Sequence, residues 1–513
     1  MNAEQAYLFR HALVRDAAYQ LQLPGDRGRL HALAVELIEA LCGGRAPEPA
    51  PLDSPEPPPL QPHMTDAFAE ELAEHAGAAC RAAGAGAAMV TARRLYGRRA
   101  AENAERSFQH GTAERLWRQH AAIVEGTERA ESLRRAGTVA HRTGRPGDAE
   151  PLWKRALALH REAGNLRLIG ASQANLASLY AQSGRIGLAD RTFAEALAIH
   201  RRVGDRRSEG ITLGDLGNLY EASGRRKLAE RSYAEAIAID RETRNRRFEG
   251  IVLANLAALY TDTGRVELAE RSYDQSLDIL RRFGDRRLQG IVLASLAALN
   301  QEMGKVALAE RHFLEAIAMN REAGDRRSEG IALGNLAIAY KESGRIELAE
   351  QTQTAALAIH REVGNRRFEG IAHRNMASLH HRAGRIESAE RSFAEALAIF
   401  REVGDADSEG IALGNLACLY RDAGRGAQAE RAYKEALSIL RKVRDRRFEG
   451  VHRCGYGVLL ACLHRVDPAR RNWRKGASIL RQIGDTRTFR LLSEEMQKAC
   501  GAAGVPLLEE PGR

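Results

Sequence analysis

The chain has 513 residues, of which 44% are hydrophobic and only 5% aromatic, and its formal net charge is +10. This length exceeds what a single hydrophobic core supports, so the sequence predicts several domains or a repeat array, and the low aromatic content favours closely packed helices. No run approaches the roughly 18 apolar residues of a membrane-spanning helix, and charges stand where a signal peptide would be apolar, so we expect a cytoplasmic protein that does not contact membranes.

Residues 1–42 predict two helices with a break at Pro24-Gly25. The phrase FRHALVRDAAY, from Phe9 to Tyr19, resembles the end of the winged-helix region that follows the nucleotide-binding domain in signal-transduction ATPases, among them the ATPase-linked adenylate cyclases. Residues 64–125 resemble the first, degenerate helical repeats of the same proteins. Because the sequence has no G-x-x-x-x-G-K-[ST] phosphate loop, the resemblance implies a helical remnant whose catalytic core is missing from this chain.

Residues 43–63 hold eight of the fourteen prolines. Proline fixes φ and cannot donate a backbone hydrogen bond, so this composition predicts a disordered or extended linker, semi-rigid where the prolines cluster. A proline-rich ligand motif is the alternative, which we favour less than a plain spacer.

Glycine marks a 40-residue period in the remainder of the chain. One series is Gly170, Gly210, Gly250, Gly290, Gly330, Gly370, Gly410 and Gly450, and a second is Gly144, Gly184, Gly224, Gly264, Gly304, Gly344, Gly384 and Gly424. No insertion interrupts residues 166–445; a looser unit precedes them at 126–165 and a divergent one follows at 446–485. The period predicts a stacked helical array over 126–485, with a capping helix and tail at 486–513.

Each unit predicts two helices, here called helix A and helix B. Helix A carries a leucine and, four residues later, a tyrosine, as in Leu216 and Tyr220, and helix B carries alanines around an aromatic ring such as Tyr233. These spacings place the side chains on one buried face. Glycines suit the left-handed residue that ends each helix. An Asp or Asn before each unit is placed to cap helix A: Asn165, Asp205, Asn245, Asp285, Asp325, Asn365 and Asp405.

These columns together resemble the tetratricopeptide repeat (TPR), lengthened from roughly 34 residues to 40 as in kinesin light chain and the spindle-orientation adaptors. The resemblance implies an all-α fold, an α-α superhelix or TPR solenoid, whose concave groove is lined by the A helices. It also implies a non-enzymatic scaffold that binds protein or peptide partners in that groove. Asn300 and His380 replace the helix-A tyrosine and Gln353 replaces the helix-B ring, so we expect looser packing in those units.

One polar column on helix A stands one residue before the packed leucine. It consists of Asn175, Asp215, Asn255, Ser295, Asn335, Asn375 and Asn415. Asparagine is a mediocre helix former, and its carboxamide both donates and accepts, so the column predicts side chains that grip the backbone of an extended peptide. In the resembling adaptors, asparagines at this place line the groove. The equally weighted alternative is that these side chains bond to the neighbouring A helix and fix the repeat spacing.

A second column lies in the first turn of helix A and consists of Arg167, Arg207, Arg247, Arg287, Arg327, Arg367 and Arg447, broken by Asp407. We favour salt bridges to glutamates of the preceding helix B over ligand contact.

The segment from His373 to Arg382 gathers cation-capable side chains on one A helix. Arg374, His381 and Arg382 are predicted to face the groove and, with the basic end at 446–485, to anchor an acidic or carboxylate-bearing partner segment. An exposed polar helix without a ligand is weighted equally. The histidine spacing does not suit zinc, and the scattered cysteines Cys42, Cys80, Cys418, Cys454, Cys462 and Cys500 suit reduced, mostly buried thiols.

The sequence contains no recognisable catalytic, cofactor-binding or metal motif. We therefore expect a non-enzymatic scaffold for protein or peptide partners. The alternative is the sensor arm of a signalling ATPase or cyclase. Nucleic-acid binding through the basic end is favoured least, because both signs of charge are interleaved along the array.

Overall fold

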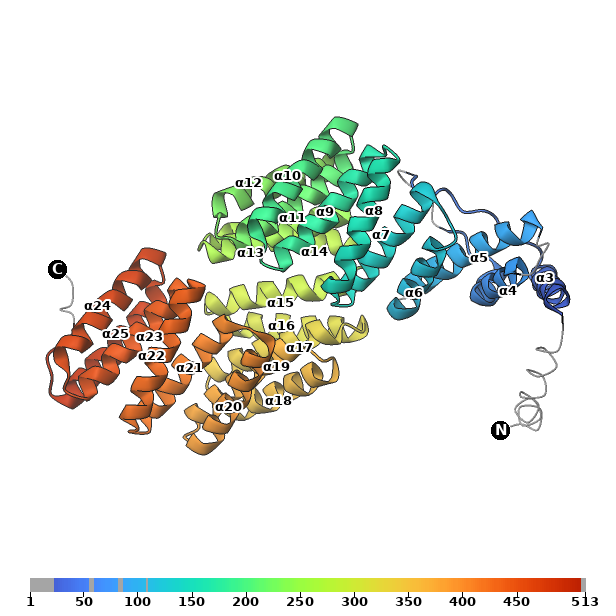
Figure 1. Ribbon diagram of the computed structural model, residues 1–513. Helices are drawn as coiled ribbons and strands as arrows, with labels where there is room; N and C mark the ends of the chain where they lie inside the picture. Colours follow the sequence, from blue (N-terminus) through green and yellow to red (C-terminus); the bar gives the residue numbers. More distant parts are fainter. Residues whose placement is uncertain (1–22, 55–59, 82–85, 108, 509–513) are drawn as a thin grey trace, which may run out of the picture. The chain divides into compact units, whose positions relative to one another are not determined.

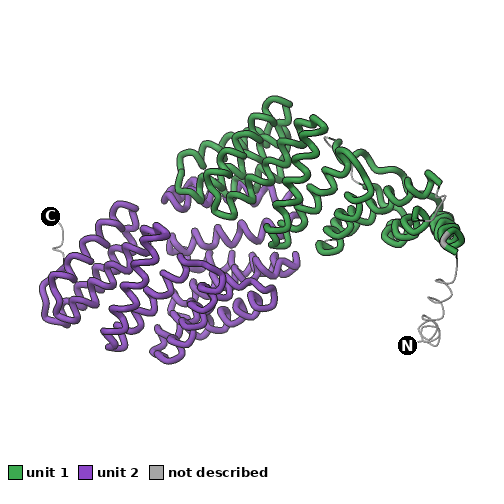
Figure 2. The backbone as a smooth tube through the Cα atoms, in the orientation of Figure 1, with its two compact units in different colours: residues 1–255 green, residues 256–513 purple. Residues whose placement is uncertain are grey.

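The computed structural model describes residues 23–54, 60–81, 86–107 and 109–508. Within them every regular element is helical, and no strand occurs. Figure 1 shows antiparallel helices following one another along the chain, and Figure 2 divides them into two compact units, residues 1–255 and 256–513. The division falls inside one A helix. The expected all-α repeat architecture is confirmed, with helices A and B alternating at the 40-residue period.

Unit 1 contains the N-terminal helices and the first repeats. Its elements are α3 (Pro24–Leu41), the 3-10 helix η1 (Met64–Phe68), α4 (Ala69–Arg81), α5 (Ala87–Arg106), α6 (His110–Ala121), α7 (Gly126–Arg142), α8 (Pro146–Glu162), α9 (Leu166–Gln182), α10 (Ile186–Val203), α11 (Arg206–Ala222), α12 (Arg226–Glu242) and the first part of α13 (Arg246–Asp262). The second helix predicted in residues 1–42 is α3; the first lies outside the described residues, as does the phrase that resembles a winged-helix region.

Unit 2 contains the rest of α13 and the remaining repeats. Its elements are α14 (Val266–Arg282), α15 (Arg286–Glu302), α16 (Val306–Glu322), α17 (Arg326–Glu342), α18 (Ile346–Glu362), α19 (Arg366–Arg382), α20 (Ile386–Val403), α21 (Ala406–Asp422), α22 (Gly426–Val443), α23 (Arg446–Cys462), α24 (Val466–Ile483) and α25 (Thr486–Ala503). None of the described helices combines the length and hydropathy that crossing a bilayer requires.

Side-chain caps begin most A helices. In five junctions the predicted cap accepts a hydrogen bond from the backbone N–H three residues ahead: Asn165, Asp205, Asp285, Asp325 and Asp405. Such a cap stabilises a helix by about 1 kcal/mol. Asn365 makes no cap bond, and Asn245 instead donates to Asp240 Oδ1 at 2.9 Å. Helix B ends on left-handed residues as expected, for example Gly204 at φ 69°.

The core of each repeat consists of a small residue on helix A and a large one on helix B. Gly330 lies so close to helix B that an added Cβ would stand 2.7 Å from His360 Cε1. The helix-B rings Phe193, Phe313 and Phe393 are at most 1% exposed, and so are the alanines beside them. Small side chains let the helices approach, and the rings fill the space that remains. The predicted core columns are confirmed.

The helix-A tyrosines also link successive repeats. Tyr340 Oη donates to Glu310 in the preceding helix B (3.1 Å), and Arg345 binds the same carboxylate at 2.8 Å while its guanidinium lies 4.4 Å from the Tyr340 ring centroid. The same triad occurs with Tyr220, Arg225 and Asp190 and with Tyr420, Arg425 and Glu390. Cation–π and charge-assisted contacts both hold this side chain in place, so the arginine of the Gly-Arg turn helps to fix the repeat stacking.

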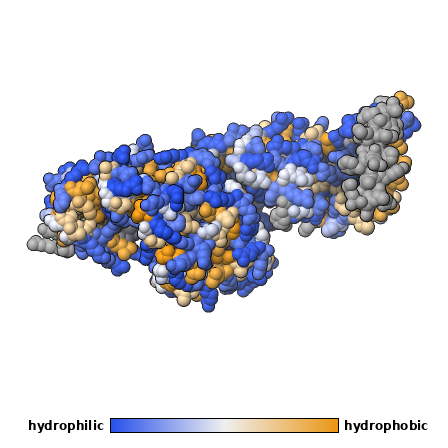
Figure 3. Space-filling model, turned by 90° about the horizontal axis from the view of Figure 1, so that it is seen from below, coloured by the Kyte–Doolittle hydropathy of each residue, from blue (hydrophilic) through white to orange (hydrophobic). Residues whose placement is uncertain are grey.

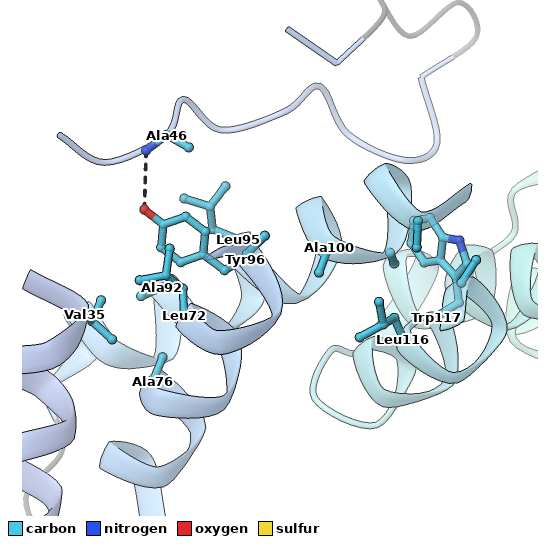
Figure 4. Packing of buried hydrophobic residues seen from close by; sticks show 14 of the residues in the cluster. Val35, Ala46, Leu72, Ala76, Ala92, Leu95, Tyr96, Ala100, Leu116 and Trp117 are labelled. Carbon is cyan, nitrogen blue, oxygen red and sulfur yellow. Dashed lines mark hydrogen bonds between the residues drawn. The ribbon is translucent and has the colours of Figure 1, made fainter. Parts of the chain in front are cut away.

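The proline-rich segment packs onto α5 in its described parts. Figure 4 shows Ala46 above Tyr96, whose hydroxyl oxygen accepts a hydrogen bond from the Ala46 backbone N–H at 3.5 Å. Arg99, which is 1% exposed, donates to the carbonyl oxygens of Pro47 and Gln61. The described residues of this segment belong to no helix or strand, and the α5 arginines bind their carbonyl groups.

Candidate functional site

The polar helix-A column is half-buried at all seven positions. In unit 1, Asp215 accepts a hydrogen bond from Ser178 Oγ (3.0 Å) and Asn255 donates to Asn218 Oδ1 (3.0 Å). Both bonds join one A helix to the preceding A helix. Burial raises the pKa of Asp215, partly opposed by the Ser178 hydrogen bond. These two side chains therefore act as spacers between helices, one of the two roles expected for the column. Asn175, also half-buried, has an Nδ2 without a hydrogen-bond partner in the described part of the chain.

In unit 2 the same column presents open amides. Asn335, Asn375 and Asn415 are half-buried, and within the described residues their side chains make no hydrogen bond to protein. A half-buried carboxamide without a partner is placed to donate to and accept from a guest backbone. The column thus bonds to the preceding A helix at Asp215 and Asn255 and leaves its amides open at the three positions in unit 2.

Three cationic side chains gather on neighbouring A helices of unit 2. Arg374 and Arg382 belong to α19, and Lys341 belongs to α17, which packs against α19. Lys341 Nζ donates to Ser378 Oγ at 3.4 Å. Burial lowers the pKa of Lys341, Glu342 opposes this, and Arg382 and Arg374 lower it further. We call Lys341, Arg374 and Arg382 the cation cluster.

Arg374 is the central member of the cation cluster. Its side chain is half-buried, and among the described residues it forms no hydrogen bond and no ion pair. Burial lowers the pKa of Arg374, an effect that the carboxylates of Asp405 and Asp407 partly offset. A cation withdrawn from water without a bonded partner costs free energy, and a bound anion would restore that loss.

His381 differs from the other predicted anchors. Its Nε2 lies 3.0 Å from Asp422 Oδ2, and this contact lowers the pKa of Asp422 against the effect of burial. The structure therefore brings Arg374 and Arg382 together with Lys341, which the sequence did not indicate, whereas His381 binds a carboxylate of the next repeat.

The first-turn arginines bind partners other than those expected. Arg287, Arg367 and Arg447 bind the cap aspartates of the following repeats, Asp325, Asp405 and Asp485, at 2.7–2.9 Å. At these three positions the prediction of bridges to glutamates of the preceding helix B was wrong, because repeat stacking brings the next cap closer. At the one position of this column that carries an aspartate, Asp407 faces the cap residue Asp445 of the next repeat. Burial and the Asp445 carboxylate raise the pKa of Asp407 to about 6.

The cysteines, the potential metal ligands and the basic end of the array also lie in the described ranges. They contain no group of three or more His, Cys, Asp or Glu side chains arranged to hold a metal ion. All six cysteines are free. In the basic end, Arg447, Arg453 and Arg465 are paired with carboxylates. On the face shown in Figure 3, hydrophobic residues are scattered among hydrophilic ones.

The sequence matches the model of one protein family over most of the array. Residues 128–202, 168–242, 249–322, 291–362 and 368–442 match the tetratricopeptide repeat. The chain belongs to the tetratricopeptide-repeat family. Among curated proteins, none has a sequence that matches this chain.

Several solved structures resemble this tetratricopeptide-repeat protein. The apo form of RapI is 12% identical, with a TM-score of 0.51 over 70% of this chain and 99% of RapI. BtubC (BKLC) from P. vanneervenii is 20% identical, with a TM-score of 0.36 over 43% of this chain and 91% of BtubC. A signal transduction ATPase with numerous domains and a tetratricopeptide repeat sensor, from Pyrococcus horikoshii, is 15% identical, with a TM-score of 0.47 over 67% of this chain and 54% of that protein. At these identities the likeness concerns the fold alone.

Proposed function

We propose that this tetratricopeptide-repeat protein is a non-enzymatic scaffold that binds an acidic peptide segment of a partner protein on the inner face of unit 2. The observation that supports this most strongly is Arg374, a half-buried guanidinium that has no bonded partner among the described residues. Lys341 and Arg382 add two positive charges to the same place.

The proposal follows from the physics of a desolvated cation. A guanidinium presents its donors in a planar fork that matches a carboxylate, and charge-assisted bonds of this kind are worth about 1.5–3 kcal/mol each. Asn335, Asn375 and Asn415 lie on the same A-helix face and present amides that suit a peptide backbone. The cation cluster supplies the preference for acid, and the asparagines supply contacts that do not depend on the guest sequence.

Selection from a random ten-residue peptide display library against the full chain tests the proposal. We expect Asp or Glu to be enriched at one position or two adjacent positions with the wild type, and this enrichment to be lost with Arg374→Ala. The neighbouring repeats carry glycine at the position of Arg374, in Gly334 and Gly414, so the variant is compatible with the fold.

Arg391→Ala is the matched control, because Arg391 is exposed on helix B of the same repeat. Acid enrichment that survives Arg374→Ala, or that is absent with the wild type, contradicts the proposal. Acid enrichment lost equally with Arg391→Ala would show an effect of net charge and contradict it as well.

A second function, the sensor arm of a signalling ATPase or cyclase, is favoured by an exposed apolar face on α3. Leu30, Leu33 and Leu37 are 48–54% exposed at helical spacing, and such a face is typical of a contact with another protein body. Co-expression with a nucleotide-binding protein encoded beside this chain tests the idea. Co-purification that is lost with Leu33→Glu would support the second function, and failure to co-purify would remove it.

A further inference from the structure

Unit 2 contains a cavity on the inner face of α15, apart from the cation cluster. Its volume is about 330 Å³, and α13, α14, α16 and α17 contribute the other walls. This volume falls in the range of pockets that bind small ligands or single side chains. Ala294, Ser295 and Ala298 form the α15 wall, and Ala258 and Ile331 lie on the flanking A helices.

At two positions on the cavity wall, α15 carries a smaller side chain than at least one flanking repeat. Ser295 stands where the flanking repeats have Asn255 and Asn335, and Ala298 stands where the next repeat has Ile338. The array therefore shows which side chains would fill the hollow without disturbing the fold. Ser295→Asn and Ala298→Ile would therefore fill the cavity with residues that the array already contains.

The rim of the cavity is anionic. Asp262, at the end of α13, and Glu302, at the end of α15, occupy the same position one repeat apart and both line the cavity. Both side chains are exposed, and neither forms a hydrogen bond or an ion pair within the described ranges. Burial raises the pKa of Glu302, and the positive charges of Arg447 and Arg487 partly oppose this effect. Arg447 is already bound to Asp485 at 2.9 Å.

The floor of the cavity holds a polar group without a partner. Asn320 is 0% exposed and lines the cavity, and neither its Oδ1 nor its Nδ2 has a hydrogen-bond partner in the described part of the chain. A buried carboxamide left unpaired is unfavourable, and a polar group of a guest would satisfy it. Apolar walls, an unpaired amide and two unpaired carboxylates suit a guest with an aliphatic stem and a cationic tip.

We propose that the cavity on α15 binds an arginine or lysine side chain of the peptide that the cation cluster binds through its acidic residue. The inference rests on the proposed function and adds the second half of the recognition. The stem of the guest side chain lies along Ala294 and Ala298, and its charged tip lies between Asp262 and Glu302.

The distance between the two subsites defines the spacing in the guest. The helices α15, α17 and α19 pack in succession, and packed helix axes lie about 8–10 Å apart, so α15 and α19 are separated by about 16–20 Å. An extended chain advances about 3.3–3.6 Å per residue, which places the basic and acidic residues of the guest about five or six residues apart.

The same display selection tests the inference, read at the position five or six residues from the enriched acid. We expect Arg or Lys to be enriched there with the wild type. Ala298→Ile is expected to remove the basic preference and Glu302→Gln to weaken it, and both variants are expected to keep the acidic preference. Gln182 occupies the position of Glu302 in an earlier repeat, so both variants use residues that the array already contains.

The control is Glu315→Gln, which removes the same charge from an exposed position on α16 that does not line the cavity. Acid enrichment without a basic residue at that spacing overturns the inference and leaves the proposed function intact. Loss of both preferences overturns both. A basic preference that survives Ala298→Ile also overturns the inference.

A selected peptide in which citrulline replaces arginine gives a second test. Citrulline keeps the shape of arginine and removes its charge, so we expect about tenfold weaker binding to the wild type. We expect a smaller difference between the two peptides with Glu302→Gln, because one of the two carboxylates at the rim is then removed and Asp262 remains. Equal affinity of both peptides for the wild type would show that the cavity does not recognise a cation.

Discussion

Two glycines of α17 are expected to respond in opposite directions to the same substitution. An alanine methyl at Gly330 would lie 2.7 Å from His360 Cε1 and 3.0 Å from Ile359 Cγ2. At Gly334, one turn later, no described atom lies within 4 Å of the added methyl. Alanine in a helix interior is about 1 kcal/mol more favourable than glycine, and overpacking a core costs about 1–3 kcal/mol. We therefore expect Gly334→Ala to stabilise unit 2 by about 1 kcal/mol and Gly330→Ala to change its stability by about 0 to −2 kcal/mol.

Hydrogen–deuterium exchange of the α17 and α18 amides measures this difference locally, which matters because repeat arrays unfold in steps. One or two kcal/mol correspond to factors of about 5 and 30 in the opening equilibrium. Exchange is expected to slow about fivefold in Gly334→Ala and to quicken by up to about 30-fold in Gly330→Ala. Equal slowing in both variants would mean that helix B does not lie against Gly330, and the packing scheme of every repeat would be refuted.

Three substitutions probe buried charge through the local stability of the helices that carry them, again measured by hydrogen–deuterium exchange. Burial raises the pKa of Asp240 to about 6, so the free-energy cost of its buried charge grows as pH rises from 4 to 6. Asp240→Asn should therefore stabilise the folded protein by about 1–3 kcal/mol at pH 7.5 but little at pH 4.5. Asp407→Arg should replace a carboxylate pair with the salt bridge of other repeats and stabilise by about 1 kcal/mol at pH 7.5, less at pH 5, where Asp407 is protonated. Burial lowers the pKa of His452 to about 4, so stability falls as pH drops below 6.5, and His452→Leu should lessen that fall. A pH-independent effect would contradict each assignment.

The sequence predicts the helices of this chain because the signals that begin and end them are local. A cap such as Asp325 binds an amide three residues ahead, and Gly344 ends a helix through its own φ. The register follows from a 40-residue period without insertions. The contacts of the Gly-Arg turn with the preceding repeat were not predicted, since Tyr340 and Arg345 bind Glu310, which is 30 or more residues away.

The candidate site was only partly predictable for the same reason. Arg374 and Arg382 stand out along one helix, whereas Lys341 joins them only through the packing of α17 on α19. The cavity on α15 requires three successive A helices, and its small residues Ser295 and Ala298 look unremarkable alone. Comparing equivalent positions of neighbouring repeats, rather than neighbours along the chain, would have indicated both features.

Calorimetric titration of a selected acidic peptide into the wild type and Arg374→Ala tests the central claim most directly. We expect the variant to bind at least tenfold more weakly, about 1.4 kcal/mol, while its circular dichroism and thermal unfolding stay within error of the wild type or improve. Equal affinity of the two proteins would contradict the account, because a guanidinium that the guest does not contact cannot be the anchor of the site.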